Sequence, residues 1–144
     1  MPNTPPIIAI TDDDQDDRLL LAAAFAEAAP GCQILIFDGA SALLAHLRTA
    51  AHNENGGLPA LLLLDLNMPG IDGHQTLIQI RAEPGLKHLP VVILSTSRSP
   101  SDCLKSYQQG ANAFVSKPSG YLDLVATARR LVQFWTEVAR LPAV

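Results

Sequence analysis

The stretch 61–73, Leu-Leu-Leu-Leu-Asp-Leu-Asn-Met-Pro-Gly-Ile-Asp-Gly, decides how the rest of the chain is interpreted. The apolar run 60–64 is too short to cross a membrane, and Pro59 and Pro69 stand on either side of it. These features predict a short strand that is buried on both faces, as in a parallel sheet. Asp65 follows at the carboxyl end of this strand, where open α/β sheets place their ligands. Asp65 is therefore the first candidate functional residue.

The composition predicts one folded domain. The chain has 144 residues, of which 48% are hydrophobic and 17% charged, with a net charge of −4. No cluster of Lys and Arg indicates nucleic-acid binding. No apolar run approaches the ~20 residues of a membrane helix, and the first residues do not resemble a signal peptide. We therefore expect a cytoplasmic protein without a nucleic-acid or membrane partner. Cys32 and Cys103 are far apart and are expected to be reduced thiols.

Five apolar runs alternate with five segments of helical periodicity. The expected strands are 7–11, 33–37, 60–64, 91–94 and 113–116, and the expected helices centre on 21–28, 41–51, 75–81, 101–109 and about 119–140. A polar loop at 53–57 precedes the third strand. This alternation predicts an α/β fold, a doubly wound five-stranded parallel sheet. We expect a single domain over 1–144, with a core of about 7–130 and a C-terminal helix extension of about 131–141.

Polar side chains follow four of these strands, and right-handed crossovers would bring them to one edge of the sheet. They are Asp12, Asp13, Asp65, Ser95, Thr96 and Lys117. Neighbouring carboxylates stay ionised cheaply only with a cation, and a partly hydrated all-oxygen site suits Mg²⁺. An ammonium and a hydroxyl suit phosphoryl oxygens, so the set predicts phosphoryl transfer onto an aspartate. Taken singly, each residue also has a plain structural explanation, as a helix cap, a turn residue or a partner of the backbone.

In this order, the acidic pair, the D-L-N-M-P-G-I-D-G run, the hydroxyl and the Lys-Pro pair resemble the receiver domain of two-component response regulators. The resemblance covers nearly the whole chain and implies a flavodoxin-like (βα)5 fold. It also implies a role for each site residue. These are Asp65 as phospho-acceptor, Asp13 as the main Mg²⁺ ligand, Asp12 as a ligand through water, Asn67 as a ligand through its carbonyl, Ser95 as the switch hydroxyl and Lys117 as the phosphoryl contact.

The resemblance implies that a sensor histidine kinase donates a phosphoryl group to Asp65. The protein would then act on an unidentified downstream protein by contact, since no output domain follows Pro142, and would not be an enzyme beyond its own phosphorylation and dephosphorylation. The Lys117–Pro118 bond is typically cis in this family. Phe114 departs from the family pattern because the aromatic switch position often holds Tyr or His. We expect it to respond sterically to Ser95.

Two features resemble, more loosely, the stand-alone regulators that pair with bacterial phytochromes. They are the polar loop at 53–57 and the ending F-W-T-E-V-A-R-L-P at 134–142. A phytochrome-type kinase is therefore a candidate partner.

Two other functions remain open on the residues alone. A phosphatase of the haloacid-dehalogenase type also uses an Asp nucleophile and Mg²⁺, but it expects a second Asp where this chain has Asn67. A receiver-like binding module that is never phosphorylated would not need Asp13, Asp65, Ser95 and Lys117 together. Labelling by acetyl phosphate with Mg²⁺ distinguishes the three functions.

The last predicted helix carries more apolar surface than one core-facing helix needs. Val125, Ala128, Val132 and Trp135 recur at helical spacing and should pack on the sheet. A second set should extend the apolar surface around one side, namely Leu131, Phe134, Val138 and Leu141. Contiguous exposed apolar patches usually mark interfaces, and two-fold dimers are the commonest oligomers. The pattern therefore predicts a symmetric homodimer through this helix and the neighbouring fifth strand, with an apolar tail folded on the body as the alternative.

Overall fold

The computed structural model describes residues 4–53, 56–68 and 70–142, and a five-stranded parallel sheet lies at its centre. The strands are β1 (Ile7–Thr11), β2 (Gln33–Phe37), β3 (Leu61–Leu64), β4 (Val91–Ser95) and β5 (Ala113–Ser116). Their order is β2-β1-β3-β4-β5, and every neighbouring pair is parallel. The predicted fold class is confirmed. Residues 54 and 55 of the polar loop, and Pro69 of the turn, lie outside the described residues.

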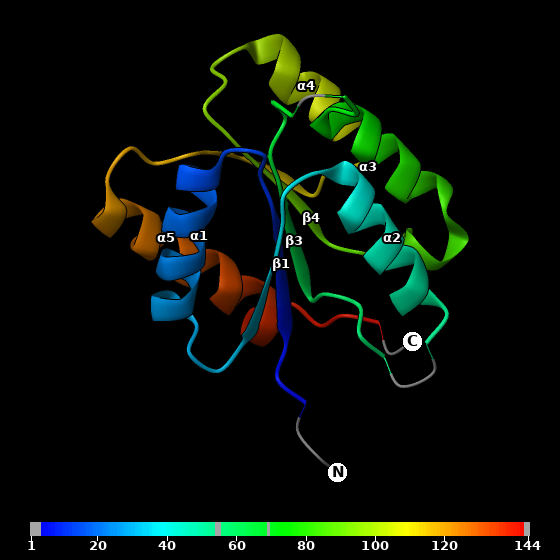
Figure 1. The fold of residues 1–144 in the computed structure, drawn as a ribbon, viewed down its shortest axis with the longest axis horizontal. Helices are drawn as coiled ribbons and strands as arrows, with labels where there is room; N and C mark the ends of the chain where they lie inside the picture. Colours follow the sequence, from blue (N-terminus) through cyan, green and yellow to red (C-terminus); the bar gives the residue numbers. More distant parts are fainter. Residues whose placement is uncertain (1–3, 54–55, 69, 143–144) are drawn as a thin grey trace.

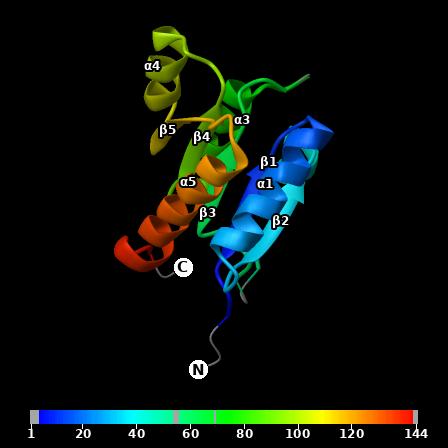
Figure 2. The same cartoon turned by 90° about the vertical axis from the view of Figure 1, so that its left-hand side faces the viewer.

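Helices cover both faces of the sheet (Figure 1). On one face lie α1 (Gln15–Ala28) and α5 (Tyr121–Gln133), which run side by side in both views (Figure 2). On the other face lie α2 (Ala40–Ala51) and α3 (Gly73–Ala82), with α4 (Pro100–Gln108) beyond them next to β5. A short 3-10 helix, η1 (Pro84–Leu86), follows α3.

The four leucines of β3 explain why this strand is central. All four are essentially inaccessible to solvent. Side chains alternate along a strand, so Leu62 and Leu64 join the core beneath α2 and α3, while Leu61 and Leu63 join the core beneath α1 and α5. An uninterrupted apolar run is therefore what a strand covered on both faces requires.

Side-chain caps start the two helices, α1 and α3, that follow strands β1 and β3. The Asp14 side chain accepts the N–H of Asp17 at 2.8 Å and caps α1. Asp72 and Gln75 form a reciprocal capping box at the start of α3. Because the Asp14 cap begins α1 soon after β1 ends at Thr11, Asp12 and Asp13 lie between the strand and the first turn of the helix.

The last helix differs from the prediction of one α-helix over about 119–140. The α-helix α5 starts at Tyr121, after Gly120 as N-cap, and a π-helical turn, η2 (Phe134–Val138), replaces its end. The Ala139 N–H reaches back to the carbonyl of Phe134 at 2.6 Å, and Ala139 itself is extended, so the helix stops there. Thr136 explains part of the distortion because its hydroxyl bonds the Val132 carbonyl at 2.7 Å.

The side chains of this last segment divide differently from the prediction in one place. Val125, Ala128 and Val132 are buried, and Trp135 packs against them as expected. Leu131 also packs against this core and does not belong to an exposed stripe. Phe134 and Val138 are exposed, at 47% and 67%.

Other sequence expectations concern the cysteines and the membrane. Cys32 and Cys103 are free thiols of intermediate exposure. Within the described ranges, no helix is both long enough and apolar enough to span a bilayer.

Candidate functional site

Three carboxylates meet where β1 and β3 end. Asp12 and Asp13 follow β1, and Asp65 follows β3, its immediate neighbour in the sheet. One oxygen from each carboxylate lies within 4.8 Å of the others. Asp12 and Asp65 are buried, at 1% and 7% exposure, whereas Asp13 is exposed. The cluster therefore has a buried floor and one side open to solvent.

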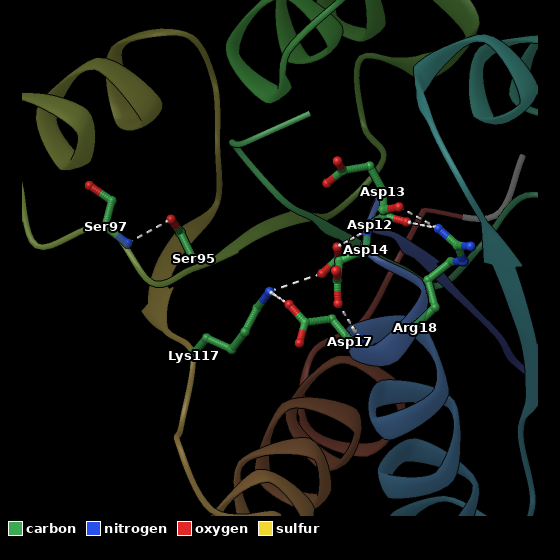
Figure 3. Close-up of polar contacts among 8 residues, drawn as sticks. All are labelled: Asp12, Asp13, Asp14, Asp17, Arg18, Ser95, Ser97 and Lys117. Carbon is green, nitrogen blue, oxygen red and sulfur yellow. Dashed lines mark hydrogen bonds and ion pairs between the residues drawn. The ribbon is translucent and has the colours of Figure 1, made fainter. Parts of the chain in front are cut away.

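Arg18 of α1 holds the backbone beneath this cluster (Figure 3). Its guanidinium donates to the carbonyl of Asp12 at 3.0 Å and to that of Asp13 at 2.8 Å. The Asp14 N–H donates to the Asp12 carboxylate at 3.0 Å. These bonds fix the backbone of Asp12 and Asp13, and the Asp12 carboxylate, relative to the start of α1. A charged donor on a carbonyl is a strong hydrogen bond, so this turn is firmly held.

Gly73 leaves room for the backbone of Asp65. A Cβ atom at position 73 would collide with the carbonyl oxygen of Asp65 and the Cα atom of Leu66. The Gly73 N–H also donates to the carbonyl of Leu66 at 3.1 Å. The start of α3 thus packs directly against the chain that carries Asp65, and only glycine fits there.

The pKa of Asp65 is raised to about 6. Burial is the main cause, and the charges of Asp12 and Asp13 raise the pKa further, while Lys117 and the backbone N–H of Asn67 lower it. An isolated buried carboxylate would be costly to ionise. A divalent cation among the three carboxylates would remove this cost, so the donor set fits a hard cation with oxygen ligands.

Lys117 brings a positive charge to the same place. Its ammonium lies 2.9 Å from Oδ2 of Asp12 and 3.3 Å from Oδ2 of Asp17 (Figure 3). The side chain is only 11% exposed. Burial by itself would lower the pKa of Lys117, but the hydrogen bond and charge of Asp12, with Asp65 and Asp17, raise it above its ordinary value. Lys117 is therefore charged at neutral pH.

Ser95 lies at the end of β4 and is fully buried. Its hydroxyl accepts the N–H of Ser97 at 3.0 Å, and its carbonyl accepts the N–H of Lys117 at 2.8 Å. The Ser97 hydroxyl in turn donates to Asp102 at 2.6 Å. The other carboxylate oxygen of Asp102 lies 3.6 Å from Nε2 of His74. A chain of polar contacts therefore runs from Ser95 through α4 to α3.

Phe114 lies in β5, half-buried against the core beneath α2 and α3. Its backbone N–H donates to the Tyr107 hydroxyl at 3.1 Å. Tyr107 of α4 therefore places a phenol hydroxyl against the backbone of Phe114. Whether Phe114 moves with Ser95 stays a prediction.

Two further expectations, for Asn67 and for the Lys117–Pro118 bond, concern the edge of the site, where Asp38 also lies. Asp38, after β2, is exposed and stands outside the three-carboxylate cluster. The Asn67 N–H faces the Asp65 carboxylate, and a ligand role for the Asn67 carbonyl stays a prediction. The Lys117–Pro118 bond is trans, contrary to the family pattern, since no cis peptide bond occurs among the residues described. A trans bond is the ordinary preference before proline.

The family whose pattern matches this sequence is described as "Response regulator receiver domain", and the match covers residues 8–129. The chain belongs to the response regulator receiver domain family. Response regulator Rcp1 of Synechocystis sp. is 33% identical over 141 residues, which cover 98% of this chain and 96% of that protein. In this receiver domain, the acidic cluster of Asp12, Asp13 and Asp65 lies at the carboxyl edge of the sheet.

Solved structures of receivers share this fold at a sequence identity close to that of Rcp1. The phosphorylated cyanobacterial phytochrome response regulator RcpA has a TM-score of 0.86 at 31% identity, covering 97% of this chain and all of that chain. The Mn²⁺-bound form of Rcp1 has a TM-score of 0.81 at 32% identity, covering 96% of this chain and all of that one. The acidic cluster of this receiver has the carboxylate arrangement of a metal-binding site.

The structure brings the predicted Asp12, Asp13, Asp65 and Lys117 together, with Ser95 at the end of the adjoining strand. Sequence reasoning missed the roles of Arg18, Gly73 and Asp17. Arg18 and Asp17 look like ordinary first-turn helix residues, so no pattern distinguished them. Gly73 was visible in the quoted stretch, but only the packing shows why glycine is needed.

Proposed function

We propose that this receiver accepts a phosphoryl group on Asp65 and signals through the resulting change in shape. An Asp65 carboxylate oxygen attacks phosphorus, the bond from phosphorus to the donor nitrogen breaks, and its electron pair leaves with the imidazole. Water later attacks the acyl phosphate and releases inorganic phosphate. The observation that supports this most is the buried Asp65 carboxylate, which makes no ion pair with any residue that the structure describes and lies at the same sheet edge as the charged Lys117.

Asp12, Asp13 and Asp65 would hold a Mg²⁺ ion, with the Asn67 carbonyl as a further ligand. Mg²⁺ prefers one or two carboxylates with several waters, and the open side at Asp13 leaves room for water. When bound, the ion neutralises negative charge on the phosphoryl oxygens. Lys117 would bind another phosphoryl oxygen, and Ser95 would offer its hydroxyl to a third.

The test is phosphorylation by acetyl phosphate with Mg²⁺, followed by intact mass. We expect a gain of one phosphoryl group in the wild type and none in Asp65→Asn, since an amide is a poor nucleophile of nearly the same shape. Labelling of Asp65→Asn at the wild-type rate would contradict the assignment. Sustained turnover of phosphoesters would favour a phosphatase, although Asn67 replaces the general acid that such enzymes expect. No labelling at all would favour a binding module.

We propose that this receiver is cytoplasmic and that a sensor histidine kinase is its phosphodonor. A phytochrome-type kinase is the candidate we favour, because RcpA is described as a cyanobacterial phytochrome response regulator and resembles this chain over nearly its full length. Phosphotransfer from a purified phytochrome kinase, compared with an unrelated kinase, tests this choice. Equal rates from both would count against it.

We also propose contact through the end of the chain, either with a second copy or with an unidentified downstream protein. Phe134 and Val138 of η2 present exposed apolar surface beside the α5 core. A homodimer is the simplest arrangement. Light scattering should give a dimer mass for the wild type and a monomer mass for Phe134→Asp. A wild type that stays monomeric at high concentration, with and without a phosphoryl mimic, contradicts the dimer.

We propose that residues 1–144 act as one receiver unit with a core of about 7–130 and an extension of about 131–141. The family match over 8–129 and the single sheet support this division. Residues 1–3 and 143–144 lie outside the part of the chain that the structure describes.

A further inference from the structure

The lysine of the site has a second acidic partner that its proposed role does not require. Lys117 contacts both Asp12 and Asp17 through its ammonium (Figure 3). Among the described residues, these two carboxylates are the ion-pair partners of Lys117, and Asp65 is not one of them. The residue that should contact a phosphoryl group on Asp65 is therefore held toward α1.

The two partners of Lys117 differ in how firmly they hold it. Asp12 is buried and makes the shorter contact, at 2.9 Å. Asp17 lies in the first turn of α1, its side chain is 40% exposed, and its contact is 3.3 Å long. An exposed ion pair is weak and screened by water, whereas breaking a buried one leaves a charge uncompensated. An incoming anion would therefore displace Asp17 before Asp12.

The position of Asp17 is also set independently of Lys117. Its backbone N–H donates to the capping side chain of Asp14, which anchors the first turn of α1. Asp17 lines a pocket of about 450 Å³ together with Ser95, Thr96 and Lys117. Asp17 therefore lines the same pocket as Ser95 and Lys117, the groups that would bind the phosphoryl oxygens.

We propose that Asp17 is a positioning residue that holds the Lys117 ammonium toward α1 in the unphosphorylated protein and releases it when a phosphoryl group is bound at Asp65. This inference rests on the proposed function. The release costs one weak ion pair and gains one ammonium–phosphoryl contact. Asp17 therefore favours the unphosphorylated state.

The experiment measures the affinity for beryllofluoride, a phosphoryl mimic, in the presence of Mg²⁺. Asp17→Asn should bind it about two- to fivefold more tightly than wild type, the range typical of one exposed ion pair. Asp16→Asn is the matched control, because it removes the same charge from the same turn at an exposed position. It should leave the affinity unchanged, and Asp17→Glu should restore it to the wild-type value.

A second readout follows the Lys117 ammonium directly by NMR. The signals of wild type and Asp17→Asn should differ in the free proteins and coincide once beryllofluoride is bound. Equal affinities for Asp17→Asn and Asp16→Asn, weaker binding by Asp17→Asn, or Lys117 signals that coincide in the free proteins would each overturn the inference. If the wild type binds no beryllofluoride, both the proposed function and the Asp17 inference fail. If the wild type binds it but Asp17→Asn has no effect, the Asp17 inference fails and the proposed function stands.

Discussion

Replacing Asp65 by asparagine should stabilise the folded protein at neutral pH. The pKa of Asp65 rises from an ordinary 3.8 to about 6 on folding, chiefly through burial. Each pKa unit corresponds to about 1.36 kcal/mol, so the ionised carboxylate costs the folded state about 3 kcal/mol. Asn keeps the shape of the side chain and removes the charge. Asp65→Asn should therefore gain about 3 kcal/mol in free energy of unfolding.

The gain should depend on pH in a defined direction. Between about pH 4 and pH 6 the folded wild type holds the Asp65 proton more tightly than the unfolded chain. The contribution of this group to wild-type stability is therefore most favourable below about pH 4, falls as the pH rises, and is level above about pH 6. The advantage of Asp65→Asn should be nearly zero at about pH 4 and complete at about pH 7.5.

Urea unfolding measures this difference when both proteins are followed by circular dichroism in EDTA, at pH 4 and at pH 7.5. In thermal unfolding at pH 7.5, a gain of 3 kcal/mol corresponds to roughly 6–12 °C for a domain of this size. Asp16→Asn serves as the control for loss of a surface charge. A destabilised Asp65→Asn, or an equal gain at both pH values, would refute the reasoning, because neither result follows from a buried ionised carboxylate.

Three further results are expected. Mg²⁺ should raise the free energy of unfolding by mass action, by about 1.4 kcal/mol at tenfold excess over its Kd, and so raise the Tm; Asp13→Asn should remove most of this gain. A wild-type Tm insensitive to millimolar Mg²⁺ would exclude the site. Gly73→Ala should lower the free energy of unfolding in urea by about 1–3 kcal/mol and slow acetyl-phosphate labelling, because its Cβ would meet the backbone of Asp65 and Leu66. Gly120→Ala, whose Cβ would enter open space, is the control, and similar losses in both variants would contradict this packing. Ser97→Ala should leave labelling of Asp65 intact but reduce the phosphorylation-dependent chemical-shift changes in α4, because it removes the hydrogen bond to Asp102. Undiminished changes would show that the Ser97–Asp102 hydrogen bond does not carry the change to α4.

Local sequence determined the strands and most of the site. The short apolar run of β3 with prolines on both sides indicated a strand covered on both faces, and the polar residues after the strands share one edge because the sheet is parallel. The sequence pattern alone therefore predicted that Asp12, Asp13 and Asp65 lie together, as the structure shows. Strand periodicity is a property of short segments, so the sequence carries it, and the right-handed crossover is a general rule that any β-α-β unit follows.

Tertiary structure alone decided which groups pair across the site. Lys117 and Asp17 are 100 residues apart, and their contact depends on how α1 packs against the segment after β5. The same holds for Gly73, whose need for glycine comes from the backbone of Asp65, and for the π-helical turn at Phe134, which no periodicity indicates. Such features depend on ångström-scale distances between segments, because a hydrogen bond or a steric clash is lost within one ångström, and the sequence records only the type of each residue.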